Sequence, residues 1–144
     1  NKSREFILGG RPDIVIEFEA GGYGIIDFKT TKLSETKSED YKFQLEAYAQ
    51  IFTKPGSIKK GPTPKLDPIT HMGILQFDPS YIHQHDNEGC DMKMKTFYSP
   101  LTRNEEEFFN HITYVIDILT NPKIPEFTED CNFCSFIEQQ INIK

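Results

Sequence analysis

Hydrophobic and polar residues alternate with a period of two near the start of the chain. From Asp13 to Glu19 every second residue is apolar, and three of the four residues on the other face are acidic. This period predicts a β-strand. The glycine pair 21–22 predicts a tight turn, and residues 24–29 predict the second strand of an antiparallel hairpin. A shorter strand is expected earlier, over residues 4–8.

The period changes in the middle of the chain. Apolar residues recur at intervals of three and four between Asp40 and Phe52, which predicts a helix. A polar loop over residues 30–38 should precede it. Residues 54–70 contain four prolines, two glycines and four lysines, a composition that predicts a long flexible loop without regular structure.

Two further strands are predicted over residues 72–77 and 92–98, and they can form a second hairpin. The polar stretch from His83 to Asp91 lies between them. This stretch is rich in residue types that bind metals, but its Asn87 and Gly89 favour a solvated hairpin loop over a metal site.

A capping box predicts the start of the last helix. Asn104 is followed three residues later by Glu107, and the helix should run to about Thr120. The resulting order of elements is β-β-β-α-β-β-α. It predicts an α/β domain over residues 1–144 with a mixed sheet flanked by helices.

Composition narrows the class of protein. The chain has 144 residues, a formal charge of −6 and 37% hydrophobic residues, which excludes overall disorder. It contains no run of apolar residues long enough to span a membrane and no leader pattern, so a cytoplasmic protein without membrane partners is expected. Because the chain starts at Asn1, directly before a predicted strand, we expect a piece of a longer protein from which an upstream element is missing.

Three charged side chains form the candidate site. Asp27 and Lys29 share one face of their strand, about 7 Å apart along it. The antiparallel hairpin brings Asp13 close to them. Two carboxylates suit Mg²⁺ or Mn²⁺, and a lysine can neutralise charge on a phosphate, so the cluster predicts phosphodiester hydrolysis.

An Asp-x-Lys pattern on a strand is also common in proteins without such an activity. Asp27, however, lies in an otherwise apolar run between Ile26 and Phe28. An unpaired charge there would be costly, so the Asp27 carboxylate should have a cationic partner or a metal ion.

Three motifs occur in a fixed order: Gly10-Arg11-Pro12-Asp13, Ile26-Asp27-Phe28-Lys29-Thr30 and Gln44-Leu45-Glu46-Ala47-Tyr48. Together they resemble the PD-(D/E)XK nuclease superfamily, and most closely its RecB-type and CRISPR-associated exonuclease branch. The resemblance implies a restriction-endonuclease-like core, in which the missing upstream element is a helix. It also implies that Asp13, Asp27 and the backbone carbonyl of Phe28 bind a divalent metal, and that Lys29 is the catalytic lysine.

The resemblance gives roles to two residues of the predicted helix. Gln44 and Tyr48 are four residues apart and therefore lie on one helix face, which an ordinary amphipathic helix would also explain. By resemblance Gln44 orients the catalytic lysine or the substrate, and Tyr48 contacts nucleic acid. Some relatives also carry an iron–sulphur cluster on four cysteines.

This chain has three cysteines, of which Cys131 and Cys134 form a C-x-x-C pair and Cys90 lies far away. Four thiolates are the usual requirement for an iron–sulphur cluster, and no pair of histidines accompanies the C-x-x-C motif as zinc ligands. We therefore expect two reduced thiols, with an iron–sulphur or zinc site as the alternative.

The sequence predicts a Mg²⁺- or Mn²⁺-dependent DNA nuclease, and by resemblance an exonuclease that works on single- or double-stranded DNA. A helicase or other recombination, repair or defence proteins would be its partners. A catalytically inactive nucleic-acid-binding or scaffolding module of the same fold is the alternative. A hydrolase of small phosphoesters is a third interpretation, which the acidic composition keeps open.

Overall fold

The structure is a computed structural model. It describes residues 6–34, 36–58, 61–62, 64–85, 89–123, 131, 133–134 and 136–137. The chain divides into two compact units, Asn1–Phe108 and Phe109–Lys144. The first unit contains the sheet and all three motifs, so it is described first.

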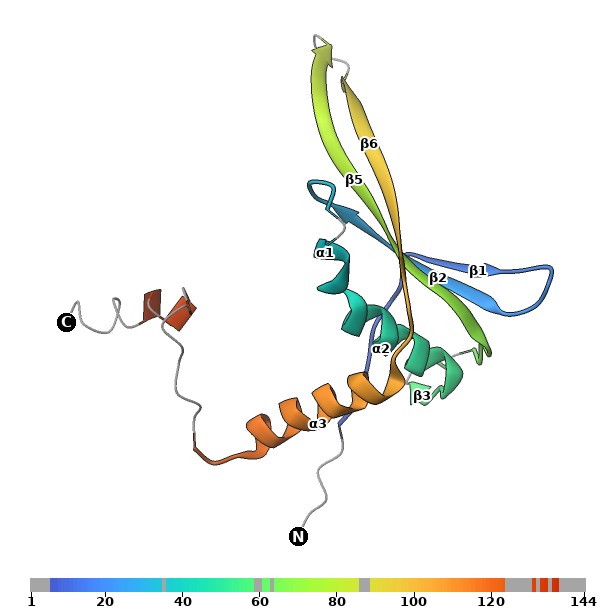
Figure 1. The fold of residues 1–144 in the computed structure, drawn as a ribbon, viewed down its shortest axis with the longest axis vertical. Helices are drawn as coiled ribbons and strands as arrows, with labels where there is room; N and C mark the ends of the chain where they lie inside the picture. Colours follow the sequence, from blue (N-terminus) through green and yellow to red (C-terminus); the bar gives the residue numbers. More distant parts are fainter. Residues whose placement is uncertain are drawn as a thin grey trace. The chain divides into compact units, whose positions relative to one another are not determined.

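The first unit is built on a four-stranded mixed sheet with the strand order β1-β2-β5-β6 (Figure 1). Its strands are β1 (Ile14–Glu17), β2 (Tyr23–Thr30), β5 (Ile69–His85) and β6 (Gly89–Leu101). β2 is antiparallel to β1 and parallel to β5, and β5 is antiparallel to β6. The predicted α/β class with a mixed sheet is confirmed.

The β1–β2 hairpin turns at the glycine pair, as predicted. Gly21 and Gly22 have φ values of +91° and +84°, a region that residues with a side chain rarely adopt. The turn is closed by hydrogen bonds from the Gly21 amide to the Phe18 carbonyl, at 2.8 Å, and from the Phe18 amide to the Gly22 carbonyl, at 3.1 Å. The turn fixes the register in which Ile14 pairs with Ile26.

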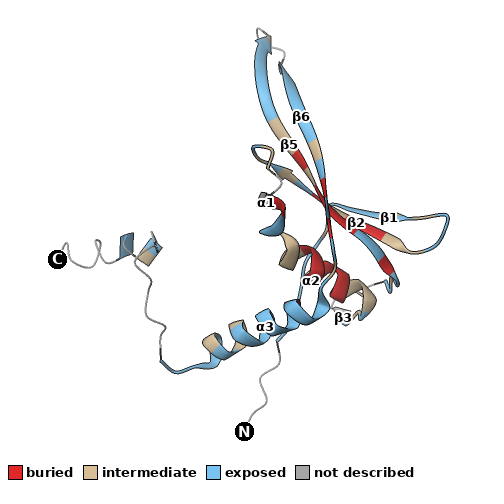
Figure 2. Cartoon of the chain, in the orientation of Figure 1, coloured by how far each residue is buried: buried red, intermediate tan, exposed pale blue. Residues whose placement is uncertain are grey.

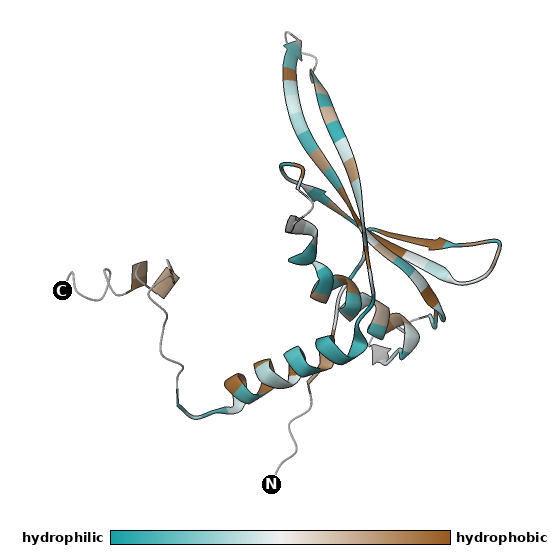
Figure 3. Ribbon diagram, viewed as in Figure 1, coloured by the Kyte–Doolittle hydropathy of each residue, from teal (hydrophilic) through white to brown (hydrophobic). Residues whose placement is uncertain are grey.

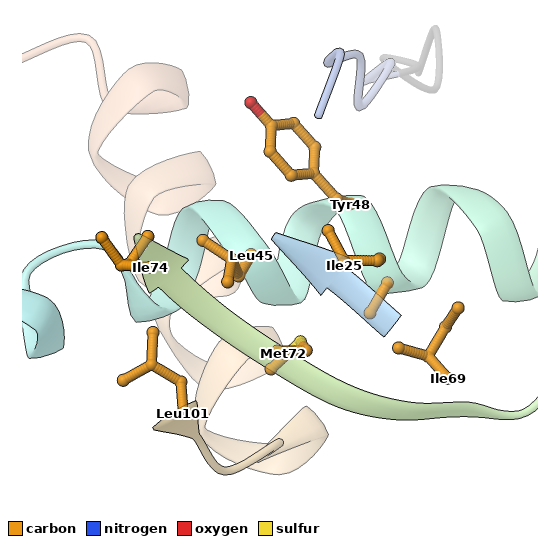
Figure 4. Packing of buried hydrophobic residues seen from close by; sticks show 8 residues of the cluster. Ile25, Leu45, Tyr48, Ile69, Met72, Ile74 and Leu101 are labelled. Atoms are coloured by element: carbon orange, nitrogen blue, oxygen red, sulfur yellow. The ribbon is translucent and has the colours of Figure 1, made fainter. Parts of the chain in front are cut away.

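Helix α2 (Lys42–Thr53) covers one face of the sheet, and its bounds agree with the predicted helix. Leu45 and Ala49 of α2 are fully buried against apolar side chains of β2, β5 and β6 (Figure 4). The buried residues gather where α2 crosses the strands (Figure 2). We call the sheet face that α2 covers the site face, because Asp27 and Lys29 stand on it with Ile25. The remaining core residues are Tyr48, Ile69, Met72, Ile74 and Leu101.

The segments on either side of α2 differ from the expectations. A short helix, α1 (Thr36–Glu39), lies within the predicted polar loop. The proline-rich segment contains two strands of two residues, β3 (Ser57–Ile58) and β4 (Gly61–Pro62), so the expectation of no regular structure there is wrong. The predicted first strand is also wrong where it is described: residues 6–8 have no regular structure, and residues 4–5 lie outside the described residues.

β5 and β6 are much longer than predicted. β2 pairs with β5 only as far as Phe77, and beyond that point β5 pairs with β6 alone. We call this two-stranded extension the arm; it consists of residues 78–85 of β5 and 89–95 of β6. Hydrophilic and hydrophobic residues alternate along it (Figure 3). The expected loop from His83 to Asp91 is therefore wrong at both ends, and residues 86–88 lie outside the described residues.

Helix α3 (Glu105–Thr120) begins at the predicted capping box. The Glu107 amide donates to Asn104 Oδ1 at 3.1 Å, and Asn104 Nδ2 donates to Glu107 Oε2 at 2.9 Å. The three glutamates of its first turn lie at the positive end of the helix dipole. Phe108, the first residue of its apolar stripe, is buried.

A buried ion pair connects α2 to the segment before α3. Glu46 is 1% exposed, and its Oε1 accepts hydrogen bonds from Arg103 Nη2 at 2.8 Å and from Gln50 Nε2 at 3.0 Å. Its Oε2 accepts from the Asn104 amide at 3.2 Å. Both carboxylate oxygens are thus satisfied, which a buried charge requires. Lys42 and Lys54 add exposed pairs to Glu107 and Glu105.

In the second unit Cys131 and Cys134 are joined by a disulfide. The expectation of two reduced thiols is therefore wrong. Residues 133–134 and 136–137 are helical. Among the residues that the structure describes, no helix is long and apolar enough to cross a membrane.

The Glu46–Arg103 pair should be a main contribution to the stability of the first unit. We expect Arg103→Leu to lower the free energy of unfolding by about 3 kcal/mol, because the Glu46 carboxylate would stay buried without its cation. Urea denaturation followed by circular dichroism measures this change. Lys54→Ala is the matched control: its pair with Glu105 has side chains that are 66% and 47% exposed, so its loss should be below about 1 kcal/mol. Equal losses in both variants would contradict the role of burial.

The exposed pair at the start of α3 should depend on pH. The hydrogen bond from Lys42 lowers the pKa of the Glu107 carboxyl below its ordinary value of 4.5. The stabilisation is therefore complete above that value, and it is lost as the pH falls through the lower native pKa. A carbon-13 NMR titration of the Glu107 carboxyl should show its midpoint rising toward 4.5 in Lys42→Met. An unchanged midpoint would show that Lys42 is not the cause.

Candidate functional site

The centre of the site is an ion pair on β2. Asp27 is 3% exposed, and its Oδ2 lies 2.6 Å from Lys29 Nζ. The two residues are two apart on one strand, so both side chains project from the site face. The partner that the apolar surroundings of Asp27 require is therefore Lys29, whose side chain remains 23% exposed and reaches solvent.

A second group on α2 fixes the position of Lys29. Lys29 Nζ donates to Gln44 Oε1 at 3.0 Å, and Gln44 Nε2 donates to the Tyr48 hydroxyl at 2.8 Å. The amide of Gln44 thus bridges the lysine and the tyrosine. The structure brings together the second and third sequence motifs in one chain of polar contacts, from Asp27 through Lys29 and Gln44 to Tyr48.

Tyr48 is almost completely buried, whereas a residue that contacts a large substrate should be accessible from the surface. It is 7% exposed and belongs to the buried cluster drawn in Figure 4. Its ring lies against Gly10 of the first motif. A Cβ atom at Gly10 would come within 3.0 Å of two ring carbons of Tyr48, so only glycine fits there without movement of the ring. This geometry supports a positioning role for Tyr48, while contact with nucleic acid stays a prediction.

Tyr41 also contacts the lysine, although sequence reasoning placed it only in the apolar stripe of the helix. Lys29 Nζ lies 4.7 Å from the centroid of the Tyr41 ring, within the range of a cation–π interaction. Tyr41 comes three residues before Gln44, so the two side chains occupy one edge of the helix start. That spacing was the signal in the sequence that could have identified it.

Asp13 reaches the site from the end of β1. Its Oδ2 accepts a hydrogen bond from the Phe28 amide at 2.7 Å. The register that pairs Ile14 with Ile26, continued by one residue, places Asp13 opposite Asp27. The hydrogen bond from the Phe28 amide holds the Asp13 carboxylate at the Phe28 backbone, while the role of this carboxylate as a metal ligand together with Asp27 stays a prediction.

These groups have the chemistry that a hard divalent cation prefers. Two carboxylates and the carbonyl of Phe28 are oxygen donors of the kind that Mg²⁺ binds alongside water and substrate phosphate. Asp27 Oδ2 is buried, and it has no hydrogen-bond donor of suitable geometry although it contacts the Lys29 ammonium. In the described part of the chain, no group of three or more His, Cys, Asp or Glu side chains could hold a metal. Substrate oxygens and water would have to complete the shell.

None of the contacts described for this site involves a cysteine. Cys131 and Cys134 belong to the second unit and form a disulfide, whereas Cys90 is an exposed free cysteine at the start of β6. An iron–sulphur or zinc site at Cys131 and Cys134 needs thiolates, so it would require reduction of this disulfide. The stretch from His83 to Asp91, which was predicted as a loop, belongs to the arm wherever it is described.

Comparison with known proteins identifies the family but no individual relative. No curated protein matches the chain, and no solved structure matches it. The sequence matches the model of the PD-(D/E)XK nuclease superfamily over residues 2–139, which is nearly its whole length. The mixed sheet with the motifs on β2 and α2 is consistent with the restriction-endonuclease-like fold of that superfamily. The chain therefore belongs to the PD-(D/E)XK nuclease superfamily.

Proposed function

We propose that this protein is a DNA nuclease that hydrolyses phosphodiester bonds with Mg²⁺ or Mn²⁺. Membership of the superfamily implies nuclease activity. The observation that carries the assignment to this site is the contact network of Lys29, which joins Asp27 at 2.6 Å and Gln44 at 3.0 Å. A lysine held by two partners and still open to solvent is suited to meet a substrate phosphate.

The metal ligands in this proposal are Asp13, Asp27 and the carbonyl of Phe28. A divalent ion bound by them would polarise the phosphodiester and activate the attacking water. Asp27 has to serve both the ion and Lys29, and its two carboxylate oxygens allow this. The Asp13 carboxylate lies next to the second motif, because its Oδ2 accepts a hydrogen bond from the Phe28 amide at 2.7 Å.

Lys29 is the residue that we assign to the reacting phosphate. Its ammonium is placed to neutralise negative charge on the phosphoryl oxygens as this charge develops. Gln44 and Tyr41 act as positioning residues, because they contact Lys29 and not the reacting atoms. Tyr48 in turn holds the amide of Gln44 in the orientation that directs its oxygen to the lysine.

Finer parts of the proposal rest on the resemblance in the three motifs. The RecB-type and CRISPR-associated branch favours an exonuclease that acts in recombination, repair or defence beside a helicase or similar partner. An inactive nucleic-acid-binding or scaffolding module of the same fold is the second candidate. It is favoured by one observation: among the described residues only two carboxylates, Asp13 and Asp27, are available to hold the ion.

Removal of either member of the ion pair should abolish cleavage. We expect Lys29→Met and Asp27→Asn each to reduce the cleavage rate by at least about 100-fold, because each removes a charge that acts on the phosphate or the ion. The measurement is cleavage of end-labelled single- and double-stranded DNA in Mg²⁺, in Mn²⁺ and in EDTA. The product ladder also distinguishes cutting from an end from internal cutting.

Lys65→Met is the matched control for this experiment. Lys65 is an exposed lysine that pairs with Asp67 at 3.6 Å, away from the site, so its removal should leave the rate unchanged. If the wild type binds DNA and leaves it intact in both metals, the inactive binding module becomes the correct assignment. Equal activity in Lys29→Met and the wild type would show that Lys29 takes no part in the reaction.

The ring of Tyr41 should matter for activity while its hydroxyl should not. We expect Tyr41→Leu to lower kcat about tenfold through loss of the cation–π contact, and Tyr41→Phe to retain the wild-type rate. Steady-state kinetics measures kcat, and urea denaturation of both variants separates this effect from general destabilisation. A loss of kcat in Tyr41→Phe equal to that in Tyr41→Leu would contradict the role of the ring.

A further inference from the structure

The arm carries the site face of the sheet outward beyond the strands that hold the site. On β6, the residues at positions 95, 93 and 91 continue the face of Ser99 and Leu101, which are buried under α2. On β5, Gln76 belongs to the same face and lies beside Lys29 in the parallel register. The side chains that follow on this face of the arm therefore continue outward along the strands from the level of Lys29.

A β-bulge decides which side chains of β5 appear on that face of the arm. Pro79 pairs with Met94 and Tyr81 pairs with Lys93, so Ser80 is an extra residue in β5. The bulge shifts the alternation of β5 by one residue. As a result Tyr81 and His83 share the site face with Lys93, where an uninterrupted strand would have turned them to the opposite face.

Two rings are stacked on this face in the open. Tyr81 is 58% exposed, and its ring is nearly parallel to that of His83, with a centroid distance of 6.2 Å and an interplanar angle of 11°. The Tyr81 hydroxyl lies 3.3 Å from His83 Nδ1. The hydrogen bond and the stacking hold the rings in a common orientation, which lowers the entropy that a stacking ligand would have to remove.

The charges beside the rings are balanced. Lys93 lies directly opposite Tyr81 and Lys95 opposite Asp78, while Asp91 lies opposite His83. The face is therefore not the continuous basic stripe that a duplex backbone requires. Exposed rings with single cations beside them are suited to unpaired bases, because every base has a π face and stacking tolerates any sequence.

We propose that Tyr81 and His83 form a platform on which bases of an unpaired nucleic-acid strand stack while the same strand occupies the site. The inference rests on the proposed nuclease function and names its substrate class. Along β5, Tyr81 and His83 lie roughly 15 to 20 Å beyond the residue level with Lys29, which a short single strand can span. The loop of residues 31–34 is held to Gln76 by Ser34, and its Lys32 is exposed.

Binding of a fluorescent single-stranded oligonucleotide of about 20 nucleotides tests the platform. Fluorescence anisotropy is measured in EDTA with the full chain, so that no cleavage occurs. We expect the double variant Tyr81→Thr, His83→Thr to bind about tenfold more weakly or worse. Threonine is chosen because it favours strands and should preserve the arm. Tyr81→Phe keeps the ring, and Gln84→Ala alters the other face of the arm at the same distance; both should bind within about twofold of the wild type.

Cleavage gives a second measure that separates the platform from the site. The rate on the oligonucleotide is divided by the rate on bis(p-nitrophenyl) phosphate, a phosphodiester too small to reach the arm. We expect this ratio to fall about tenfold in the double variant and to stay constant in Gln84→Ala. Failure of the nuclease proposal would show as no metal-dependent cleavage of either substrate, whatever the binding result.

Several results would overturn the platform. One is equal affinity of the double variant and the wild type for the single strand. Another is no binding of single strands by the wild type. A third is a loss of affinity in the double variant that is equal for duplex and single strand. An unchanged ratio of the two rates would also overturn it. A loss of affinity in Gln84→Ala as large as that in the double variant would overturn it too, because Gln84 lies on the face of the arm opposite the rings.

Discussion

The burial of one carboxylate organises the first unit of this protein. Asp27 is 3% exposed in the central strand of a sheet, where an isolated negative charge would be strongly unfavourable. The Lys29 ammonium 2.6 Å away makes that burial tolerable. A lysine that must stay beside a buried partner has lost much of its freedom, so the contact that stabilises Asp27 also orients the cation. Stability and chemistry depend here on the same pair.

Helix α2 connects this pair to the rest of the fold. One side of the helix presents Gln44 and Tyr48 to the lysine. Glu46 and Gln50, each two residues further along the helix, point to a different part of the core. Glu46 is fixed by Arg103 and by the amide of Asn104. The helix that positions Lys29 is therefore itself positioned by a second buried charge. Two buried carboxylates, each with one cationic partner, hold opposite sides of one helix.

Sequence reasoning identified the parts of the fold in which one face is buried and the other is not. The hairpin of β1 and β2, helix α2 and the cap of α3 were predicted with nearly correct bounds, because their patterns reflect contact with one core. It failed for the arm, where both faces meet solvent and polar residues such as His83 and Gln84 occupy strand positions. The site residues could be grouped from the motifs. The pair of Glu46 with Arg103 could not, because it depends on how two separate segments meet in space. For the ring of Tyr41 beside Lys29, the spacing of Tyr41 from Gln44 was the only signal.

The bulge at Ser80 shows why such features escape a linear pattern. A period of two assigns Asp78 and Ser80 to one face and Tyr81 to the other, and only the pairing of β5 with β6 reveals that one residue is skipped. Without the skip, Ile82 and Gln84 would follow Gln76 on the site face. With it, that face receives the stacked rings, and the opposite face of the arm receives Ile82 across from Met92. A single extra residue therefore decides which side chains of the arm share a sheet face with Lys29, because it sets the parity of every position after it.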